Sequence, residues 1–195
     1  MQLKFLSRRK FLIVVLAVLM IFAAPIFYYV YKNIVAIPKR AQAQEQASLK
    51  PLLRLKIPRI NVYSDVEEVG LNPDGTMDVP INPDNVAWFK LGPHPGEKGS
   101  AVIAGHFGWK DGAAAAFDNL YKLSKGDKLY VEDGKGATIS FAVRESRRYY
   151  PNADTSVVFI SNDGKPHLNL ITCFGSWNEA SQSYSGRLVV FADME

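Results

Sequence analysis

Short apolar segments divided by turn sequences are the feature that most constrains the fold of this chain. Strand-like runs recur at a spacing of roughly 8–12 residues, with turn sequences such as Asn72-Pro73-Asp74-Gly75 between them. The runs lie at residues 52–58, 60–69, 86–89, 100–105, 128–131, 138–143, 168–174 and 186–192. This pattern predicts an all-β sandwich or barrel, and about 145 residues are enough for one core.

Two segments within this region do not fit the strand pattern. Residues 113–123 (AAAAFDNLYKL) favour a helix, the only good helix candidate after the first 50 positions. Residues 144–166 contain scattered apolar patches, and we expect a long connection there.

The N-terminal part contains an almost unbroken apolar run at residues 11–31 (FLIVVLAVLMIFAAPIFYYVY). As a helix of about 32 Å it would cross the ~30 Å hydrocarbon layer of a membrane. Four basic residues precede the run, whereas only Lys32 follows it closely. The positive-inside rule therefore predicts a cytoplasmic N-terminus, a single pass through the cell membrane, and an extracellular remainder.

A cleaved signal peptide is the alternative, because Phe22-Ala23-Ala24 offers small residues for cleavage. The apolar region of such a peptide is ordinarily only about 7–15 residues long, which favours the uncleaved signal anchor. The expected organisation is a basic cytoplasmic tail (1–10), a transmembrane signal anchor (11–31), a linker (32–50) and a folded domain (51–195).

The net charge of +4 arises at the N-terminus. Five of the 23 basic residues and none of the 19 acidic residues lie in the first 32 positions, so residues 33–195 hold 18 basic and 19 acidic residues. The basic excess is therefore a targeting feature, and we expect no nucleic-acid partner.

Cys173, the only cysteine, ends an alternating apolar run, and the sequence Phe174-Gly175-Ser176-Trp177 then breaks the alternation. We expect its thiol at a strand end, at the mouth of a loop. A lone cysteine cannot form an internal disulfide, and it can equally be a small buried hydrophobe.

Two further reactive groups stand at the termini of predicted strands, His106 after residues 100–105 and Arg187 at the start of the last strand, residues 186–192. A thiolate nucleophile, an imidazole that moves protons and a guanidinium that holds an oxyanion together fit acyl transfer. The sequence has no HExxH motif or acidic-histidine cluster, so we expect neither a metal site nor a cofactor.

The sequence contains two other histidines that could partner the thiol. His94 lies between prolines in a loop, and His167 precedes the strand that carries Cys173. His106 is preferred because it ends a buried strand. Any of the three can instead be a bystander, and Arg187 an exposed salt-bridge partner.

Several motifs, in this order along the chain, carry a resemblance to a known family. They are Ala101-Val102-Ile103-Ala104-Gly105-His106, Leu170-Ile171-Thr172-Cys173 and the late Arg187. Over residues 50–193 the sequence resembles the sortases, the membrane-anchored cysteine transpeptidases of bacterial surfaces. Further segments resemble the class F branch: Ile57-Pro58, Val69-Gly70-Leu71, Asp74-Gly75-Thr76-Met77 through Pro80, Gly92-Pro93 and Pro95-Gly96.

The resemblance implies a closed eight-stranded β-barrel and a site built from Cys173, His106, Arg187 and Thr172. Cys173 would attack a C-terminal sorting signal such as Leu-Pro-x-Thr-Gly between Thr and Gly. His106 would serve as acid and base, Arg187 would hold the oxyanion or signal backbone, and Thr172 would assist in substrate binding. The implied partners are secreted proteins with sorting signals and an amine of a peptidoglycan precursor or a pilin.

Two other functions use the same residues differently. An envelope thiol peptidase would pass the acyl group to water, and a non-catalytic anchored binding module would keep Cys173 as a structural residue. A thiol and an imidazole with ordinary pKa values would be ionised together in less than about 1% of molecules at pH 7. For an enzyme we therefore expect a pH–rate profile with two opposed limbs.

Overall fold

The computed structural model describes residues 24–25, 28–29, 53–180 and 182–195. Residues 24–25 and 28–29 are helical and exposed. The rest of the predicted signal anchor (11–31), the tail (1–10) and the linker (32–50) lie outside the described residues, so these assignments stay predictions. Within the described ranges no helix has both the length and the hydropathy that a membrane crossing requires.

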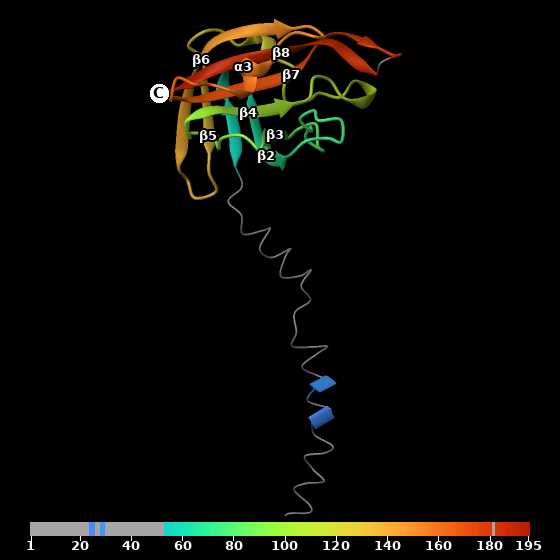
Figure 1. Cartoon of the computed structure of the whole chain (residues 1–195), viewed down its shortest axis with the longest axis vertical. Coiled ribbons are helices and arrows are strands. Elements are labelled where there is room, and N and C mark those ends of the chain that lie inside the picture. The colour runs from blue at the N-terminus through green and yellow to red at the C-terminus, as the bar shows by residue number, and fades with distance from the viewer. Residues whose placement is uncertain (1–23, 26–27, 30–52, 181) are drawn as a thin grey trace, which may run out of the picture. The chain divides into compact units, whose positions relative to one another are not determined.

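Pro51–Glu195 form one compact unit whose eight strands close into a barrel (Figure 1). The strands are β1 (Arg54–Ile57), β2 (Val62–Val69), β3 (Val86–Phe89), β4 (Gly99–Gly105), β5 (Lys128–Glu132), β6 (Thr138–Tyr149), β7 (Pro166–Asn178) and β8 (Ser183–Met194). Their order around the barrel is β1-β2-β3-β4-β7-β8-β6-β5, and β5 pairs with β1. The expected all-β class and closed eight-stranded barrel are confirmed.

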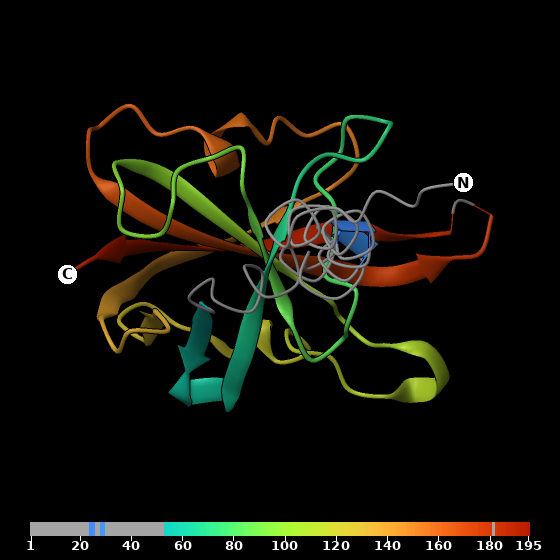
Figure 2. The same cartoon turned by 90° about the horizontal axis from the view of Figure 1, so that it is seen from below.

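Only the β2/β3 and β4/β7 pairs are parallel, and the other neighbours are antiparallel. Parallel neighbours need a crossover connection. Three long connections lie between the strands: β2–β3, β4–β5, and β6–β7, which carries the helix α3 (Ser156–Phe159) (Figure 2). All three contribute to the site described below.

The core lies inside the barrel, where alternate residues of each strand point inward. It is built largely of Leu, Ile and Val, and its bulkiest fully buried side chains are Phe117 and Phe141. A second apolar cluster, Val102, Val158, Val189 and Phe191, lies on the outer face of β4, β7 and β8 beneath α3. That outer face is therefore partly covered, and the uncovered end of it is available for a ligand.

The prediction of a helix over residues 113–123 is wrong. The segment forms turns and the short 3-10 helix η4 (Leu120–Lys122). The amide N–H of Ala116 donates to the Pro83 carbonyl and that of Phe117 to the His106 carbonyl, so tertiary hydrogen bonds replace helical ones. Two further 3-10 turns are η2 (Pro58–Ile60) and η3 (Lys110–Gly112).

Three strands are longer than the sequence pattern predicted. β8 begins at Ser183, so Arg187 lies within this strand and not at its start. β7 continues five residues past Cys173, so the thiol lies within a strand and not at its end. The register between β7 and β8 shifts between Phe174 and Trp177, and this irregularity hides the continuation in the sequence. β6 likewise runs to Tyr149, with a shift between Val143 and Glu145 where it pairs with β8.

Candidate active site

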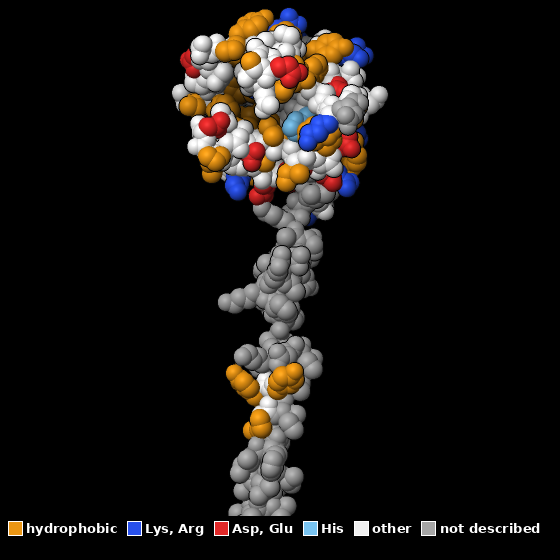
Figure 3. All heavy atoms as spheres, turned by 90° about the vertical axis from the view of Figure 1, so that its right-hand side faces the viewer, with side chains coloured by type: hydrophobic (Ala, Val, Ile, Leu, Met, Phe, Trp, Pro, Cys, Tyr) orange, Lys and Arg blue, Asp and Glu red, His pale blue; other side chains and the backbone are white. Residues whose placement is uncertain are grey.

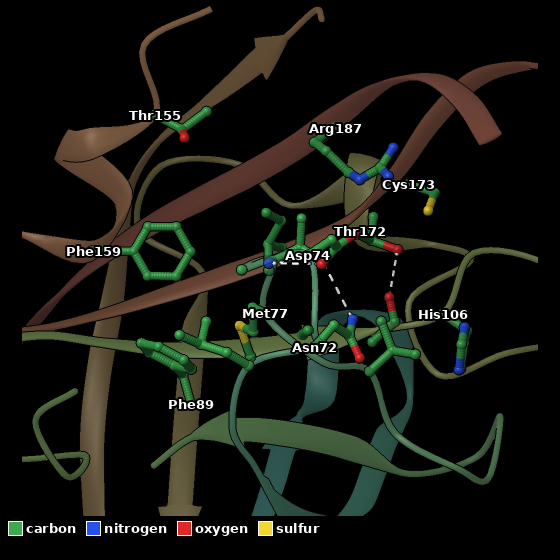
Figure 4. A pocket seen from close by; sticks show the side chains of 17 residues that line it. Asn72, Asp74, Met77, Phe89, His106, Thr155, Phe159, Thr172, Cys173 and Arg187 are labelled. Carbon is green, nitrogen blue, oxygen red and sulfur yellow. Dashed lines mark hydrogen bonds between the residues drawn. The ribbon is translucent and has the colours of Figure 1, made fainter. Parts of the chain in front are cut away.

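A cleft of ≈ 760 Å³ opens on the outer face of β4 and β7 (Figure 4). Ala104 and Ile171 lie on its floor, and residues of the β2–β3 connection form one wall. Thr155 and Phe159 from the β6–β7 connection also line it. The β2–β3 connection and the β6–β7 connection thus both border the cleft.

The three predicted catalytic residues all line this cleft. Ala104 on β4 pairs with Ile171 on β7. His106 lies two residues after Ala104, and Cys173 lies two residues after Ile171. Cys173 is in turn the register partner of Arg187 on β8. Because strand side chains alternate with a period of two, all three residues belong to the set that faces outward. Figure 4 shows them at one end of the cleft, with Phe89 and Phe159 at the other.

Cys173 is a half-buried free thiol. Burial raises the pKa of this thiol, because the thiolate is poorly solvated there, and the positive charge of Arg187 offsets part of the rise. Both influences act on the same sulfur, and burial is the larger of the two. The guanidinium of Arg187 donates a hydrogen bond to the backbone carbonyl of Gly186 at 2.9 Å, which holds it close to β8.

His106 directly follows β4 and is held from two sides. Its Nε2 lies 2.8 Å from the carbonyl oxygen of Pro80, in the β2–β3 connection. The Trp109 ring packs edge-on against the imidazole with centroids 4.7 Å apart. Gly105 is needed just before it, because a Cβ there would stand 2.5 Å from the Phe117 ring.

Thr172 lines the cleft, but its side chain is only 4% exposed. Its hydroxyl donates to the carbonyl oxygen of Gly105 at 2.8 Å. The residue before Cys173 is thereby bonded to the residue before His106, which fixes β7 and β4 to each other next to the two reactive groups.

The other two histidines lie elsewhere. His94 packs edge-on against Trp88, and His167 is buried between the carboxylates of Asp163 and Asp193. The structure therefore brings His106, and neither of these, into the cleft with Cys173. In the part of the chain that the structure describes, no cluster of three or more His, Cys, Asp or Glu side chains could hold a metal ion.

A family model for the sortase domain matches residues 55–195, most of the chain. The chain belongs to the sortase family. Sortases are cysteine transpeptidases, and this sortase has one cysteine, which lies in the cleft. No curated protein matches the sequence.

Solved sortase structures share the fold. This sortase is 26% identical to sortase C-1 from Actinomyces oris, with a TM-score of 0.60 and 82% of each chain covered. It is 24% identical to sortase A from Corynebacterium diphtheriae, with a TM-score of 0.57 over 74% of this chain and 60% of that one. For the pilus-related sortase C of Group B Streptococcus, the identity is 22% and the TM-score 0.57, over 75% and 68% of the chains.

Sequence reasoning did not identify the residues of the β2–β3 connection that form one wall of the cleft in this sortase. Asn72, Asp74 and Thr76 form a hydrogen-bonded cluster on one wall, where Asp74 accepts from both the amide and the hydroxyl of Thr76. These bonds hold the pKa of the Asp74 carboxyl below its usual range. The sequence identified this segment as a turn, but only the crossover between β2 and β3 places it beside the cleft.

Proposed function

We propose that this sortase is a membrane-anchored transpeptidase in which Cys173 is the nucleophile. Its proposed substrates are secreted proteins with a C-terminal LPxTG-like sorting signal, which it would transfer to an amine. One observation carries this proposal: Cys173, His106 and Arg187 line the same end of one cleft. The cleft extends from them to an apolar end formed by Phe89 and Phe159, and we place the peptide along it.

The proposed first half-reaction is acylation of the thiol. The sulfur of Cys173 attacks the Thr carbonyl carbon, the thiol proton passes to His106, and Arg187 stabilises the oxyanion of the tetrahedral intermediate. The C–N bond to Gly then breaks, and His106 gives the proton to the leaving amine. Thr172 keeps β7 bonded to β4 during these steps, so its proposed contribution is to orient the thiol.

The second half-reaction returns the enzyme to its starting state. An incoming amine loses a proton to His106 and attacks the thioester, and the new amide forms as the thiol of Cys173 is regenerated. The amine would come from a peptidoglycan precursor or a pilin-type protein. The pilus-related sortase C among the structural matches makes the pilin acceptor worth testing, and the class F resemblance of residues 74–80 makes the cell-wall acceptor worth testing.

The location follows from the N-terminal sequence. Residues 11–31 would anchor the chain in the cell membrane, with the N-terminus cytoplasmic and the enzyme domain extracellular.

The face in Figure 3 mixes acidic and basic side chains, with no continuous field of one sign. This face therefore does not favour a nucleic-acid partner.

The test uses a fluorogenic sorting peptide incubated with the enzyme, with and without an added amine. A transpeptidase gives the amine adduct and a trapped thioacyl enzyme of the expected mass, whereas a thiol peptidase gives only the hydrolysed product. Cys173→Ala must lose both products while keeping its unfolding temperature. Full activity of Cys173→Ala, or no thioacyl enzyme with any peptide, would leave the anchored binding module as the remaining function.

A further inference from the structure

The contact between His106 and Pro80 determines which imidazole nitrogen carries hydrogen. A carbonyl oxygen can only accept, so Nε2 of His106 is the donor in the 2.8 Å contact to the Pro80 oxygen. In the neutral imidazole, Nδ1 is then the nitrogen with the free lone pair. Proton exchange with the reacting groups is therefore the task of Nδ1, while Nε2 fixes the ring.

The same peptide group that accepts from His106 also donates to a carboxylate. The amide N–H of Ile81 donates to Oε2 of Glu67 at 2.9 Å. The Pro80 carbonyl and the Ile81 N–H are the two ends of one trans peptide, and they point in opposite directions. Glu67, this peptide group and His106 thus form one continuous line of hydrogen bonds.

Glu67 is itself rigidly held. It is half-buried on β2, where it pairs with Ala87 of β3. Its other oxygen, Oε1, accepts from the side-chain amide of Asn85 at 2.8 Å and lies 3.5 Å from the amide nitrogen of Asn82. Both carboxylate oxygens are used, so the negative charge stays behind the Pro80–Ile81 peptide.

We propose that Glu67 is a positioning residue for His106 that acts through the peptide group between Pro80 and Ile81. A carboxylate on the N–H end polarises the peptide and strengthens its carbonyl as an acceptor, because hydrogen bonds in a chain reinforce one another. The arrangement does for His106 what a carboxylate bonded directly to an imidazole does in a catalytic triad. Here one backbone amide separates the two groups.

Other titratable or charged groups belong to the same cleft or to the segment after His106, and the test must separate them from Glu67. They are Cys173, Arg187 and Asp74 in the cleft, Lys110 on the Trp109 ring, and Asp118 bonded to the Gly108 amide. None of them bonds to the Pro80–Ile81 peptide among the described residues. Glu67 is distinguished by its hydrogen bond to that peptide.

The proposal rests on the transpeptidase function, so its test includes a measurement that needs no substrate. A hydrogen-bonded imidazole N–H of His106 should give a downfield proton resonance in the free enzyme, assigned with His106→Asn. In Glu67→Gln this resonance should move upfield, because the uncharged amide polarises the peptide less. An unmoved resonance would overturn the relay whatever the enzyme's activity.

Kinetics give the second measurement. In Glu67→Gln we expect kcat/KM to fall on the order of tenfold, through kcat with little change in KM. The pH–rate profile of Glu67→Gln should also differ from that of the wild-type enzyme, because the charge next to the Pro80–Ile81 peptide is removed. An unchanged pH profile in Glu67→Gln would also contradict the proposal.

Two controls separate the relay from a structural role. Asp65→Asn removes a carboxylate on the same strand that bonds Arg54 and not the loop, so it should leave the resonance and the profile unchanged. Asn85→Ala loosens the turn without removing the charge, so it should lower activity less and keep the pH of the maximum. If Asn85→Ala matched Glu67→Gln in all readouts, Glu67 would merely hold the turn. If the resonance moved as expected but the wild-type enzyme were inactive on peptides, the positioning role would stand and the proposed function would fail.

Discussion

At the scale of single residues, the site balances two opposing influences on one thiol. Burial favours the protonated form of Cys173, and Arg187, its partner in the strand register, favours the thiolate. A protonated thiol is less open to attack by oxidants than an exposed thiolate. A bound peptide would exclude water and add a negative oxyanion during the reaction. Arg187 would then attract this oxyanion more strongly than it could in water.

Replacing Arg187 should therefore change the thiol even without substrate. In Arg187→Ala we expect the pH midpoint of Cys173 alkylation by iodoacetamide to rise, because the thiolate loses its nearby positive charge. The loss in kcat/KM should reach at least about 100-fold, since oxyanion stabilisation is lost too. Arg148→Ala, which removes a cation stacked on Phe174, is the matched control. A midpoint that falls or stays fixed in Arg187→Ala would contradict the assignment.

At the scale of elements, His167 links the end of the β6–β7 connection to β8. Nδ1 of His167 lies 2.8 Å from Asp193 on β8, and Nε2 lies 3.0 Å from Asp163 in the connection. Both ring nitrogens of His167 thus contact carboxylates, one on a strand and one in the connection. The same connection carries Thr155 and Phe159, which line the cleft. We therefore expect this linkage, the His167 anchor, to affect how the cleft binds a peptide.

The anchor can be tested through Asp163. Its hydrogen bond from His167, together with bonds from Lys165 and Ser161, holds the pKa of Asp163 well below its usual range. The stability that Asp163 contributes is therefore fully present above its unfolded pKa of about 4 and is lost as the pH falls further. In urea unfolding, Asp163→Asn should be less stable than wild type at pH 7, by a margin that shrinks below pH 4.

We also expect Asp163→Asn to raise KM for a sorting peptide several-fold, with the rate of Cys173 alkylation unchanged. Asp133→Asn, which alters a comparable carboxylate in the β5–β6 turn, should leave KM unchanged. Equal KM values for Asp163→Asn and wild type would show that the anchor does not affect the cleft.

A second element-scale prediction concerns the contact between β4 and the segment around η4. Gly105→Ala would place a Cβ within 2.5 Å of the fully buried Phe117 ring. Overpacking of this kind costs about 1–3 kcal/mol of unfolding free energy, and the displaced strand end would carry His106 with it. Gly70→Ala meets only Lys90 at 3.6 Å and should cost less than about 0.5 kcal/mol. Urea denaturation and kcat/KM measure both effects, and equal stability of the two variants would refute the packing argument.

At the scale of the whole molecule, the enzyme should be separable from its predicted anchor. Pro51–Glu195 form a compact unit and contain every residue of the cleft. The fragment 51–195 should therefore unfold at the same Tm as the full chain in detergent and cleave the peptide with similar kcat/KM. Attachment of surface proteins in cells should be lost with the fragment, because the enzyme would no longer be held at the membrane. A fragment that fails to fold would contradict this organisation.

The sequence determined the strand content, the turns and the three residue types of the site, because period-two alternation and turn chemistry are local. It did not reveal that β7 continues past Cys173 or that residues 113–123 are not helical. The register of β8 and the backbone carbonyls of Pro83 and His106 decide those outcomes, and a local apolar pattern contains no information about these partners. The resemblance supplied the closed barrel, which local pattern alone left open between a barrel and a sandwich.

What only the tertiary structure decided is which side chains meet. Glu67, Pro80 and His106 are spread over 40 positions, and nothing in their spacing links them. The parallel β2/β3 pair and the β3/β4 pair bring them together. The crossover connection that carries Pro80 returns the chain from β2 to the neighbouring strand β3, which in turn pairs with β4, the strand before His106. Local sequence sets the face of each strand on which a residue lies, whereas strand order sets its neighbours on that face.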